Sequence, residues 1–341
     1  MRRLTPIAAA AACLLAARAH GAEPPARPAP FAKGADVGWL AQMEATGYRF
    51  YDASGRHEDC LRILKNNGIN AIRLRVFVDP SPDPQSGHCS PAEVADMAVR
   101  AKGLGLRVMI DFHYSDTWAD PAKQAKPAAW AGHSFDQLLG DVYAHTFAVL
   151  SALKAHGVVP EWVQVGNEIS GGLLWPDGSA RDWSRLAPLL NRGYDAAKAV
   201  APSIKVVIHL DRGNDGARFR DFFDNFRERG GRWDVIGMSY YPWWEKKAYT
   251  ETIDALRDNL ADMASRYGKE VMVCEVGGEA AQPQDTYAML VAVQKAVRAV
   301  PDGRGLGVFY WEPEGAASWS HYPLSCWGPD GRPTLALSAF R

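Results

Sequence analysis

The chain has 341 residues, of which 47% are hydrophobic and 11% aromatic, so it is long and apolar enough to bury a large core. Its formal net charge is −1 and it contains no run of Lys or Arg, which counts against nucleic acid or an anionic membrane surface as a partner. The length fits two domains of ordinary size or one α/β barrel.

The first residues are typical of a targeting segment. Arg2 and Arg3 precede an apolar stretch, and Ala17-Arg18-Ala19 has the small-x-small pattern of a signal-peptide cleavage site. The stretch is too short for a transmembrane anchor. We expect the mature protein to be secreted or periplasmic and free of the membrane. The predicted parts of the chain are a signal peptide over residues 1–19, a Pro-rich lead-in over 20–33 and one domain over 34–341.

Eight short apolar runs, rich in Val and Ile, recur along the chain. They are nearly continuous rather than alternating, as is typical of strands that are buried on both faces. The predicted strands cover residues 33–39, 69–78, 106–113, 161–168, 204–211, 233–241, 270–277 and 306–313.

Helical patterns fill the intervals between these runs. Ser90 with Glu93, and Ser134 with Gln137, have the spacing of capping boxes at the starts of two helices. Eight strands that alternate with helices predict an α/β protein with a single (β/α)8 TIM barrel. A doubly wound open sheet is the alternative, but no Gly-rich phosphate-binding sequence follows the first strand.

Polar and aromatic side chains stand at the C-terminal ends of the predicted strands, where barrels of this class hold their active sites. His113 and His209 lack a third ligand at short spacing, so we expect them to form hydrogen bonds and predict no metal site. The strand-end residues are Arg75, Asp111, His113, Asn167, Glu168, His209, Asp211, Ser239, Tyr241, Glu275, Trp311 and Glu312.

Glu168 and Glu275 end the fourth and seventh strands, which stand nearly opposite each other in a barrel of eight. Either glutamate alone would more often pair with a loop or cap a helix. Two carboxyl groups facing each other across a cleft, however, are what cleavage of a glycosidic bond requires, because one protonates the departing oxygen while the other attacks the anomeric carbon or activates water. We expect a separation of about 5–5.5 Å. We also expect a raised pKa for Glu168, which is partly desolvated and faces a second carboxylate.

Eight tryptophans follow predicted strand ends, where indole faces can stack on sugar rings. Barrel packing accounts for some of them, and we expect about half to line the cleft. They are Trp118, Trp130, Trp175, Trp243, Trp244, Trp311, Trp319 and Trp327.

Four cysteines lie beyond the predicted signal peptide, namely Cys60, Cys89, Cys274 and Cys326. An oxidising compartment permits disulfides, and four cysteines allow three pairings. Cys60–Cys89 is favoured because these two are close in sequence. No spacing matches a metal site.

Several sequence blocks follow one another in a distinctive order: "GINAIRLRVFVDP", "DFHYSDTWADP", "VQVGNEISGG", "IGMSYYPWW", "VCEVGG" and "GVFYWEPEG". They resemble glycoside hydrolase family 53 from about residue 34 to the C-terminus. The resemblance implies a retaining endo-β-1,4-galactanase built on a (β/α)8 catalytic domain and acting on galactan or type I arabinogalactan side chains of pectin. Glu168 in "GNE" would be the acid/base, and Glu275 in "VCEVG" the nucleophile.

The resemblance also implies how the sugar is held. Arg75 would support the charge of Glu275, Tyr241 would hydrogen-bond to it, and Trp311 would form the floor of the subsite for the cleaved sugar. The residues expected to bind substrate are Arg75, Asp111, His113, Trp118, Asn167, His209, Tyr241, Trp243 and Trp311.

Some bacterial members of this family hold calcium in a long loop near strands seven and eight. The segment after Glu275 is short here, so we predict no cofactor, calcium being the one candidate. We expect a monomer whose partner is a polysaccharide. A β-mannanase or cellulase of the same clan is an alternative function. A non-catalytic carbohydrate-binding barrel is another, although the presence of both glutamates counts against it.

Overall fold

The structure is a computed structural model that describes residues 30–81, 83 and 88–341. The predicted signal peptide and residues 20–29 of the Pro-rich lead-in therefore lie outside the described residues. Residues 31–341 form one compact unit. Its first strand begins at Ala32, two residues before the predicted domain boundary.

The eight predicted strands close into a parallel barrel, which confirms the TIM-barrel fold and excludes the open sheet. Going round the barrel, the strand order is β1, β10, β9, β8, β7, β4, β3 and β2. Their bounds are β1 Ala32–Asp36, β2 Ala71–Val76, β3 Arg107–Phe112, β4 Trp162–Val165, β7 Lys205–Leu210, β8 Val235–Tyr240, β9 Glu270–Val276 and β10 Gly305–Tyr310.

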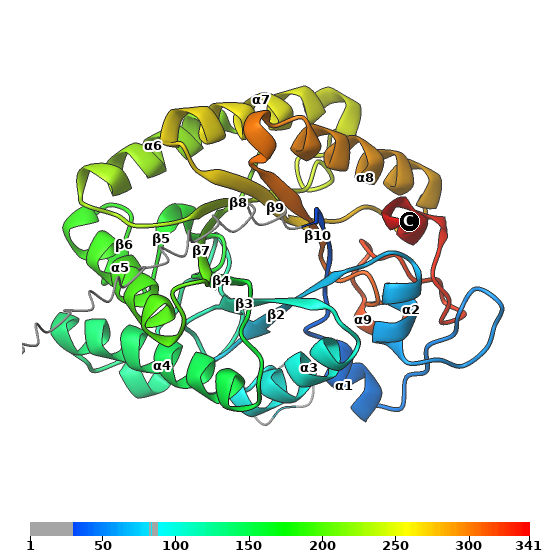
Figure 1. The fold of residues 1–341 in the computed structure, drawn as a ribbon, viewed down its shortest axis with the longest axis horizontal. Helices are drawn as coiled ribbons and strands as arrows, with labels where there is room; N and C mark the ends of the chain where they lie inside the picture. The colour runs from blue at the N-terminus through cyan, green and yellow to red at the C-terminus, as the bar shows by residue number, and fades with distance from the viewer. Residues whose placement is uncertain (1–29, 82, 84–87) are drawn as a thin grey trace, which may run out of the picture. The chain divides into compact units, whose positions relative to one another are not determined.

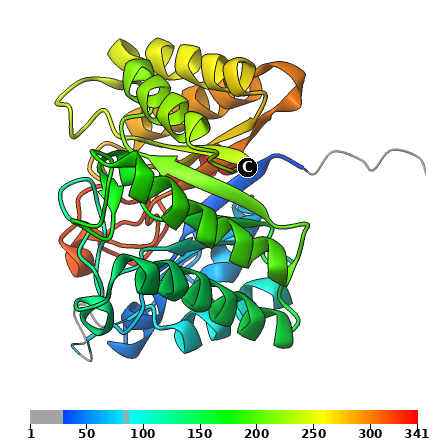
Figure 2. The ribbon, with the colours of Figure 1, turned by 90° about the vertical axis from the view of Figure 1, so that its left-hand side faces the viewer.

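Helices surround the strands, so the barrel is covered on its outer face (Figure 1). Both views place α4 and α5 side by side (Figure 2). The α-helices are α1 Leu40–Ala45, α2 Cys60–Asn66, α3 Pro91–Gly103, α4 Phe135–Ala155, α5 Trp183–Val200, α6 Gly216–Glu228, α7 Tyr249–Tyr267, α8 Pro283–Arg298 and α9 Ala317–Ser320. Short 3₁₀ turns are η1 Ala128–Trp130, η2 Ile169–Gly171, η3 Pro301–Gly303 and η4 Leu335–Phe340. In the described part of the chain, no helix combines the length and the apolarity that a membrane crossing requires.

One predicted capping box is correct and the other only half so. At α4, the Ser134 hydroxyl accepts the Gln137 amide and the Gln137 side chain accepts the Ser134 amide. At α3, Ser90 accepts the Glu93 amide, but the Glu93 carboxylate binds His88 and the backbone of Cys89 instead of Ser90.

A small antiparallel hairpin of β5 Gly172–Leu173 and β6 Gly178–Ser179 was not predicted, because two-residue strands leave no periodic pattern.

The interior of the barrel has two layers. Its lower layer is apolar and includes Trp162 and Phe309, whose rings meet edge to face at 5.9 Å. Successive residues of a strand point to opposite faces, so the residue two positions after an inward one also points inward. Strand β4 therefore follows Trp162 with Gln164, and β2 follows Ala71 with Arg73. These side chains start a buried polar layer above the apolar one.

The favoured disulfide is wrong. The four described cysteines, Cys60, Cys89, Cys274 and Cys326, are all free and buried. Cys89 donates its thiol to the carbonyl of Gly38 at 3.3 Å rather than pairing with Cys60. Closeness in sequence does not fix closeness of sulfur atoms, because the two residues belong to different βα units.

Candidate active site

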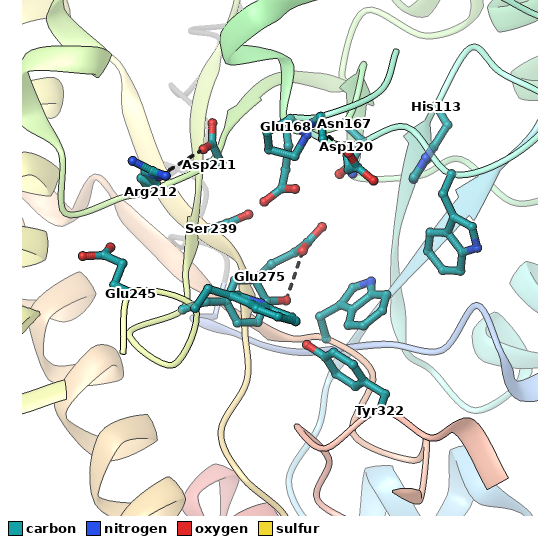
Figure 3. Close-up of a pocket in the computed structure, with 16 residues that line it drawn as sticks. His113, Asp120, Asn167, Glu168, Asp211, Arg212, Ser239, Glu245, Glu275 and Tyr322 are labelled. Carbon is teal, nitrogen blue, oxygen red and sulfur yellow. Dashed lines mark hydrogen bonds and ion pairs between the residues drawn. The ribbon is translucent and has the colours of Figure 1, made fainter. Parts of the chain in front are cut away.

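A cavity of about 570 Å³ opens where the strands end (Figure 3). Glu168 and Glu275 both point into it, from β4 and β9 respectively. Its lining combines acids, amides and aromatic rings: His113, Trp118, Asp120, Pro121, Ala122, Asn167, Glu168, Asp211, Arg212, Ser239, Tyr241, Trp244, Glu245, Glu275, Trp311 and Tyr322.

Glu168 reaches the cavity through a sharp turn of the backbone. Gly166 has φ 83° and Glu168 has φ 48°, so the chain leaves β4 in left-handed conformation. For a residue with a side chain this conformation costs on the order of 1–2 kcal/mol. Strain of this kind concentrates at functional sites. The turn carries Glu168 off the strand axis and leads into η2.

Glu275 reaches the cavity because β9 carries an irregularity. On the β8 side the pairing jumps from Met238–Val273 to Ser239–Glu275, and on the β10 side it jumps from Val308–Val273 to Tyr310–Val276. Strict alternation from the inward Cys274 would turn Glu275 towards the helices. An extra residue in a strand re-aims the side chains that follow it. The irregularity therefore allows Cys274 and Glu275 both to face the interior.

Two groups hold the Glu275 carboxylate. Arg73 Nη2 lies 2.9 Å from Glu275 Oε1, and the Tyr241 hydroxyl donates to Oε2 at 3.1 Å. The hydrogen bond predicted for Tyr241 is thus confirmed. The support predicted for Arg75 is wrong, because it comes from Arg73. Both arginines stand on the inward face of β2, two residues apart in "RLR", so the alternation itself offered Arg73 as a second candidate.

The two glutamates are driven to different protonation states. Burial raises the pKa of Glu168 well above its ordinary value, and the charge of Glu275 raises it further. Burial also raises the pKa of Glu275, to about 7, but Arg73 opposes that rise. Glu275 is therefore the carboxyl group that ionises first, while Glu168 keeps its proton. The raised pKa predicted for Glu168 is confirmed.

Arg73 is the centre of a fully buried polar network under the cavity. Its guanidinium contacts Asp36 at 2.6 Å, Asp111 at 2.8 Å and the side-chain oxygen of Asn167 at 2.9 Å. Burial disfavours ionisation of Asp111, yet Arg73 holds the pKa of that carboxyl below its ordinary value. Asn167 is thus oriented from below by the hydrogen bond that Arg73 donates to its side-chain oxygen, which leaves its amide nitrogen to donate to the carbonyl of Ala119.

The predicted histidines belong to this network and differ in their access to the cavity. His113 lines the cavity; its Nε2 lies 3.0 Å from Asp111, and its Nδ1 accepts the amide of Ala119. His209 is fully buried behind the wall, with Nε2 2.8 Å from the Ser239 hydroxyl. Burial lowers the pKa of His209 well below its ordinary value, and Arg73 lowers it further, so the ring is neutral. Of the residues expected to bind substrate, Asp111, His209 and Arg75 stand behind the lining rather than in it.

Arg75 packs instead against the aromatic side of the cavity. We call this side the aromatic wall; it consists of Trp39, Trp118, Trp311 and Tyr322. It pairs with the buried Glu312, whose second oxygen accepts the amide of Trp39 at 2.9 Å. The guanidinium centre of Arg75 lies 4.0 Å from the ring centre of Trp118. A Cβ atom on Gly38 would lie 2.2 Å from Arg75 Nη1, so any larger residue here would require the buried guanidinium to shift.

A second hollow of about 860 Å³ continues the cavity along this aromatic wall. Trp118, Trp311 and Tyr322 line both. Trp39, which was not predicted, contacts Trp311 edge to face at 5.1 Å and belongs to the second hollow. Asp120 also lines both hollows, and the remaining lining residues of the second are Gln42, Thr46, Lys123, Trp319, Ser320 and His321.

About half of the eight strand-end tryptophans line these hollows, as predicted. Trp118, Trp244, Trp311 and Trp319 do so. Trp243 does not line either hollow and packs edge to face against the exposed Trp244 at 4.5 Å, so its assignment to substrate binding stays a prediction. Trp130 and Trp327 are buried in the core, and Trp175 donates its indole N–H to the carbonyl of Gly171.

Within the described ranges, no group of three or more His, Cys, Asp or Glu side chains could hold a metal ion. The prediction that the protein needs no cofactor rests on sequence and stays a prediction.

A parallel (β/α)8 barrel with two carboxyl groups of unequal acidity in an aromatic cleft defines a barrel glycosidase. The sequence profile of glycosyl hydrolase family 53 matches residues 32–328. The chain belongs to glycosyl hydrolase family 53 and is a glycoside hydrolase.

Individual relatives agree with this membership. The chain is 34% identical to an arabinogalactan endo-β-1,4-galactanase of Thermothelomyces thermophilus, over 85% of this chain and 90% of that protein. It is 40% identical to an uncharacterized protein of Niallia circulans, over 87% and 88% of the two chains. The solved catalytic domain of a family 53 protein from Ignisphaera aggregans superposes with a TM-score of 0.85 at 34% identity, covering 93% of this chain and 97% of that one.

Proposed function

We propose that the protein is an endo-acting β-1,4-galactanase that cleaves galactan and type I arabinogalactan side chains of pectin with retention of anomeric configuration. The observation that carries the proposal is the unequal acidity of Glu168 and Glu275 in one aromatic cleft. The Thermothelomyces relative is an arabinogalactan endo-β-1,4-galactanase, which supports galactan as the polymer.

The chemistry assigns each glutamate one task in each of two steps. In the first, ionised Glu275 attacks the anomeric carbon while Glu168 gives its proton to the departing oxygen, so a glycosyl ester forms as the glycosidic bond breaks. In the second, Glu168 takes a proton from water, which attacks the same carbon and releases Glu275. Arg73 and Tyr241 stabilise the carboxylate that leaves in this second step.

Retention requires the two carboxyl groups to stand about 5–5.5 Å apart, and this separation stays a prediction. The anomer released first tests it. Proton NMR of the earliest products should show the β-anomer accumulating before mutarotation. Early α-anomer would mean an inverting enzyme and would remove the covalent intermediate from the proposal.

The polymer is tested by measuring reducing ends released from unbranched β-1,4-galactan, β-mannan and cellulose under one set of conditions. We expect galactan to be cleaved, with a fast fall in viscosity that marks endo action. Preference for mannan or cellulose would assign the protein to another activity of the same clan. No release from any of the three would favour a carbohydrate-binding barrel.

We further propose that the protein acts as a secreted or periplasmic monomer without a cofactor. The basic residues and small-x-small site within residues 1–19 support export, and the slightly acidic balance supports a free protein. N-terminal sequencing of protein from the producing cell tests cleavage near Ala19. Sedimentation of that same material tests the monomer.

A further inference from the structure

A third hollow, of about 290 Å³, lies at the opposite end of the barrel from the catalytic cleft. Trp233 and Lys269 stand just before β8 and β9, whereas the catalytic residues stand where strands end. We call it the cationic pocket. Half of its eight lining residues are basic and none is acidic: Tyr194, Arg227, Gly231, Arg232, Trp233, Arg266, Tyr267 and Lys269.

The cations of this pocket are held from behind. Asp195 binds Arg232 at 2.6 Å, and Asp224 binds Arg227 at 2.8 Å. Asp262 holds Arg266 at 3.1 Å. None of these aspartates lines the pocket, so they fix the guanidinium groups and leave its wall basic.

Each aromatic residue of the wall faces a cation of the pocket, and the Tyr194 ring also faces Lys198 outside it, whose Nζ lies 5.3 Å from the ring centre. The charged group of Arg227 lies 5.3 Å from the Tyr267 ring, that of Arg232 lies 5.1 Å from Tyr194, and Lys269 Nζ lies 5.5 Å from Trp233. These cation–π contacts hold the cations in place. Because cations already contact these rings, we expect the pocket to recognise a ligand by its negative charge rather than by stacking of a sugar on the rings.

Donors remain free after these contacts. Among the residues that the structure describes, Lys269 Nζ has no acceptor, and neither do Arg227 Nη1 and Arg266 Nη1. Arg227 donates to Asp224 only through Nη2, and Arg266 donates to Asp262 through Nε and Nη2. A ligand that satisfied the remaining donors would supply several oxygen acceptors and negative charge.

We propose that the cationic pocket binds the carboxylate of a uronate sugar within an acidic polysaccharide. The guanidinium fork matches a carboxylate. The volume of the cationic pocket is close to roughly 300 Å³, the lower end of the range for pockets that bind small molecules. That volume suits one sugar ring better than a bare oxyanion. Because the pocket lies at the far end of the barrel, a bound acidic chain leaves the catalytic cleft open to a neutral one.

The test is calorimetric titration of the full protein at low ionic strength with trigalacturonate, with neutral galactotriose and inorganic phosphate as comparators. We expect saturable binding of one trigalacturonate that galactotriose does not displace. Arg227→Gln/Lys269→Gln should weaken it at least ~10-fold, equivalent to about 1.4 kcal/mol, because the double variant removes two charged hydrogen-bond donors. The turnover of neutral galactan should stay unchanged, since neither residue touches the cleft. Lys269→Gln alone repeats the test should the double variant melt early.

A matched control removes the same charge elsewhere. Arg257→Gln/Lys65→Gln alters exposed cations outside the pocket and should leave trigalacturonate binding unchanged. Three results would overturn the proposal: absence of binding, equal weakening in the control, or phosphate binding as tightly as trigalacturonate, which would mean an adventitious ion only. Failure of the galactanase assay would leave this experiment unaffected, because it measures binding at the other end of the barrel.

Discussion

Arg73 and Glu275 lie 2.9 Å apart although two strands, β1 and β10, separate β2 from β9 in the barrel. The contact crosses the interior, where both side chains are buried. It ties the nucleophile candidate to Asp36 and Asp111, which share the same guanidinium. Arg73 therefore contacts three carboxyl groups beneath the cleft, of which Asp36 also lies 3.9 Å from Arg75.

Replacing Arg73 should damage both the activity and the fold. Arg73→Met leaves the buried Asp111 and Glu275 without their arginine and leaves Asp36 only Arg75 at 3.9 Å, and breaking a buried ion pair costs about 3–5 kcal/mol. The pKa of Glu275 should rise further without Arg73, so the acid limb of the pH–rate profile should move to higher pH. Chemical denaturation and kcat/KM profiles measure the two effects. Arg73→Lys is the control, since it keeps the charge but loses the fork. An unmoved acid limb in Arg73→Met would show that Arg73 does not tune Glu275.

Removing the proposed nucleophile should separate catalysis from binding. We expect Glu275→Ala to lose nearly all activity while it still binds galacto-oligosaccharides, because the aromatic wall is untouched. Calorimetry measures the binding and reducing-end release measures the rate. A variant that keeps more than a tenth of the wild-type rate would mean that another residue is the nucleophile.

The pH–rate profile should be bell-shaped, with each limb traceable to one glutamate. In the proposed mechanism Glu275 acts ionised, and burial raises its pKa to about 7, so activity should fall as the pH drops through that region. Glu168 acts protonated in that mechanism, and its pKa is raised well above the ordinary value, so activity should fall as the pH climbs through that higher pKa. The limbs report values for the interacting pair.

Glu168→Gln isolates the alkaline limb. A glutamine cannot lose a proton in this range, so that limb should vanish, and activity should survive best on aryl galactosides whose leaving group needs no proton. Glu245→Gln, at the rim of the same cavity, is the matched control and should keep both limbs. An unchanged alkaline limb on galactan in Glu168→Gln would exclude Glu168 as the acid.

Arg75 should affect how long chains are held, not how the bond is broken. Its guanidinium lies against Trp118 and pairs with Glu312, which holds the backbone of Trp39. We expect Arg75→Met to raise KM for long galacto-oligosaccharides roughly 10-fold, equivalent to about 1.4 kcal/mol, with little change in kcat on the shortest substrate. Melting temperature, measured in parallel, separates this effect from general loss of stability. An equal fall in kcat on every chain length would place Arg75 at the reacting centre instead.

Chelation should leave the enzyme unaffected. In the described part of the chain no cluster of His, Cys, Asp or Glu suits a metal ion, and the segment after Glu275 is short. We expect EDTA to change neither the galactanase rate nor the melting temperature. A lower melting temperature that added calcium restores would contradict this prediction.

The sequence by itself determined the fold and the placement of Glu168 and Glu275 in one cleft. Eight apolar runs of strand length are a local signal, and a barrel places the ends of all its strands at one face. Glu168 and Glu275 could therefore be assigned to one cleft without knowing any distance. The share of tryptophans lining the cleft followed from the same reasoning.

What the tertiary structure decided were the pairings across the barrel. The alternation of side chains along β2 makes Arg73 and Arg75 equal candidates for the contact with Glu275. Only the closed barrel shows that Arg73 reaches Glu275 while Arg75 reaches Glu312. The irregularity in β9 that turns Glu275 inward is visible only in its register with β8 and β10. The separation of Cys60 from Cys89 likewise depends on where two βα units are placed. Sequence periodicity sets which face of an element a residue occupies, whereas the contacts across a closed barrel depend on the register of all eight strands together.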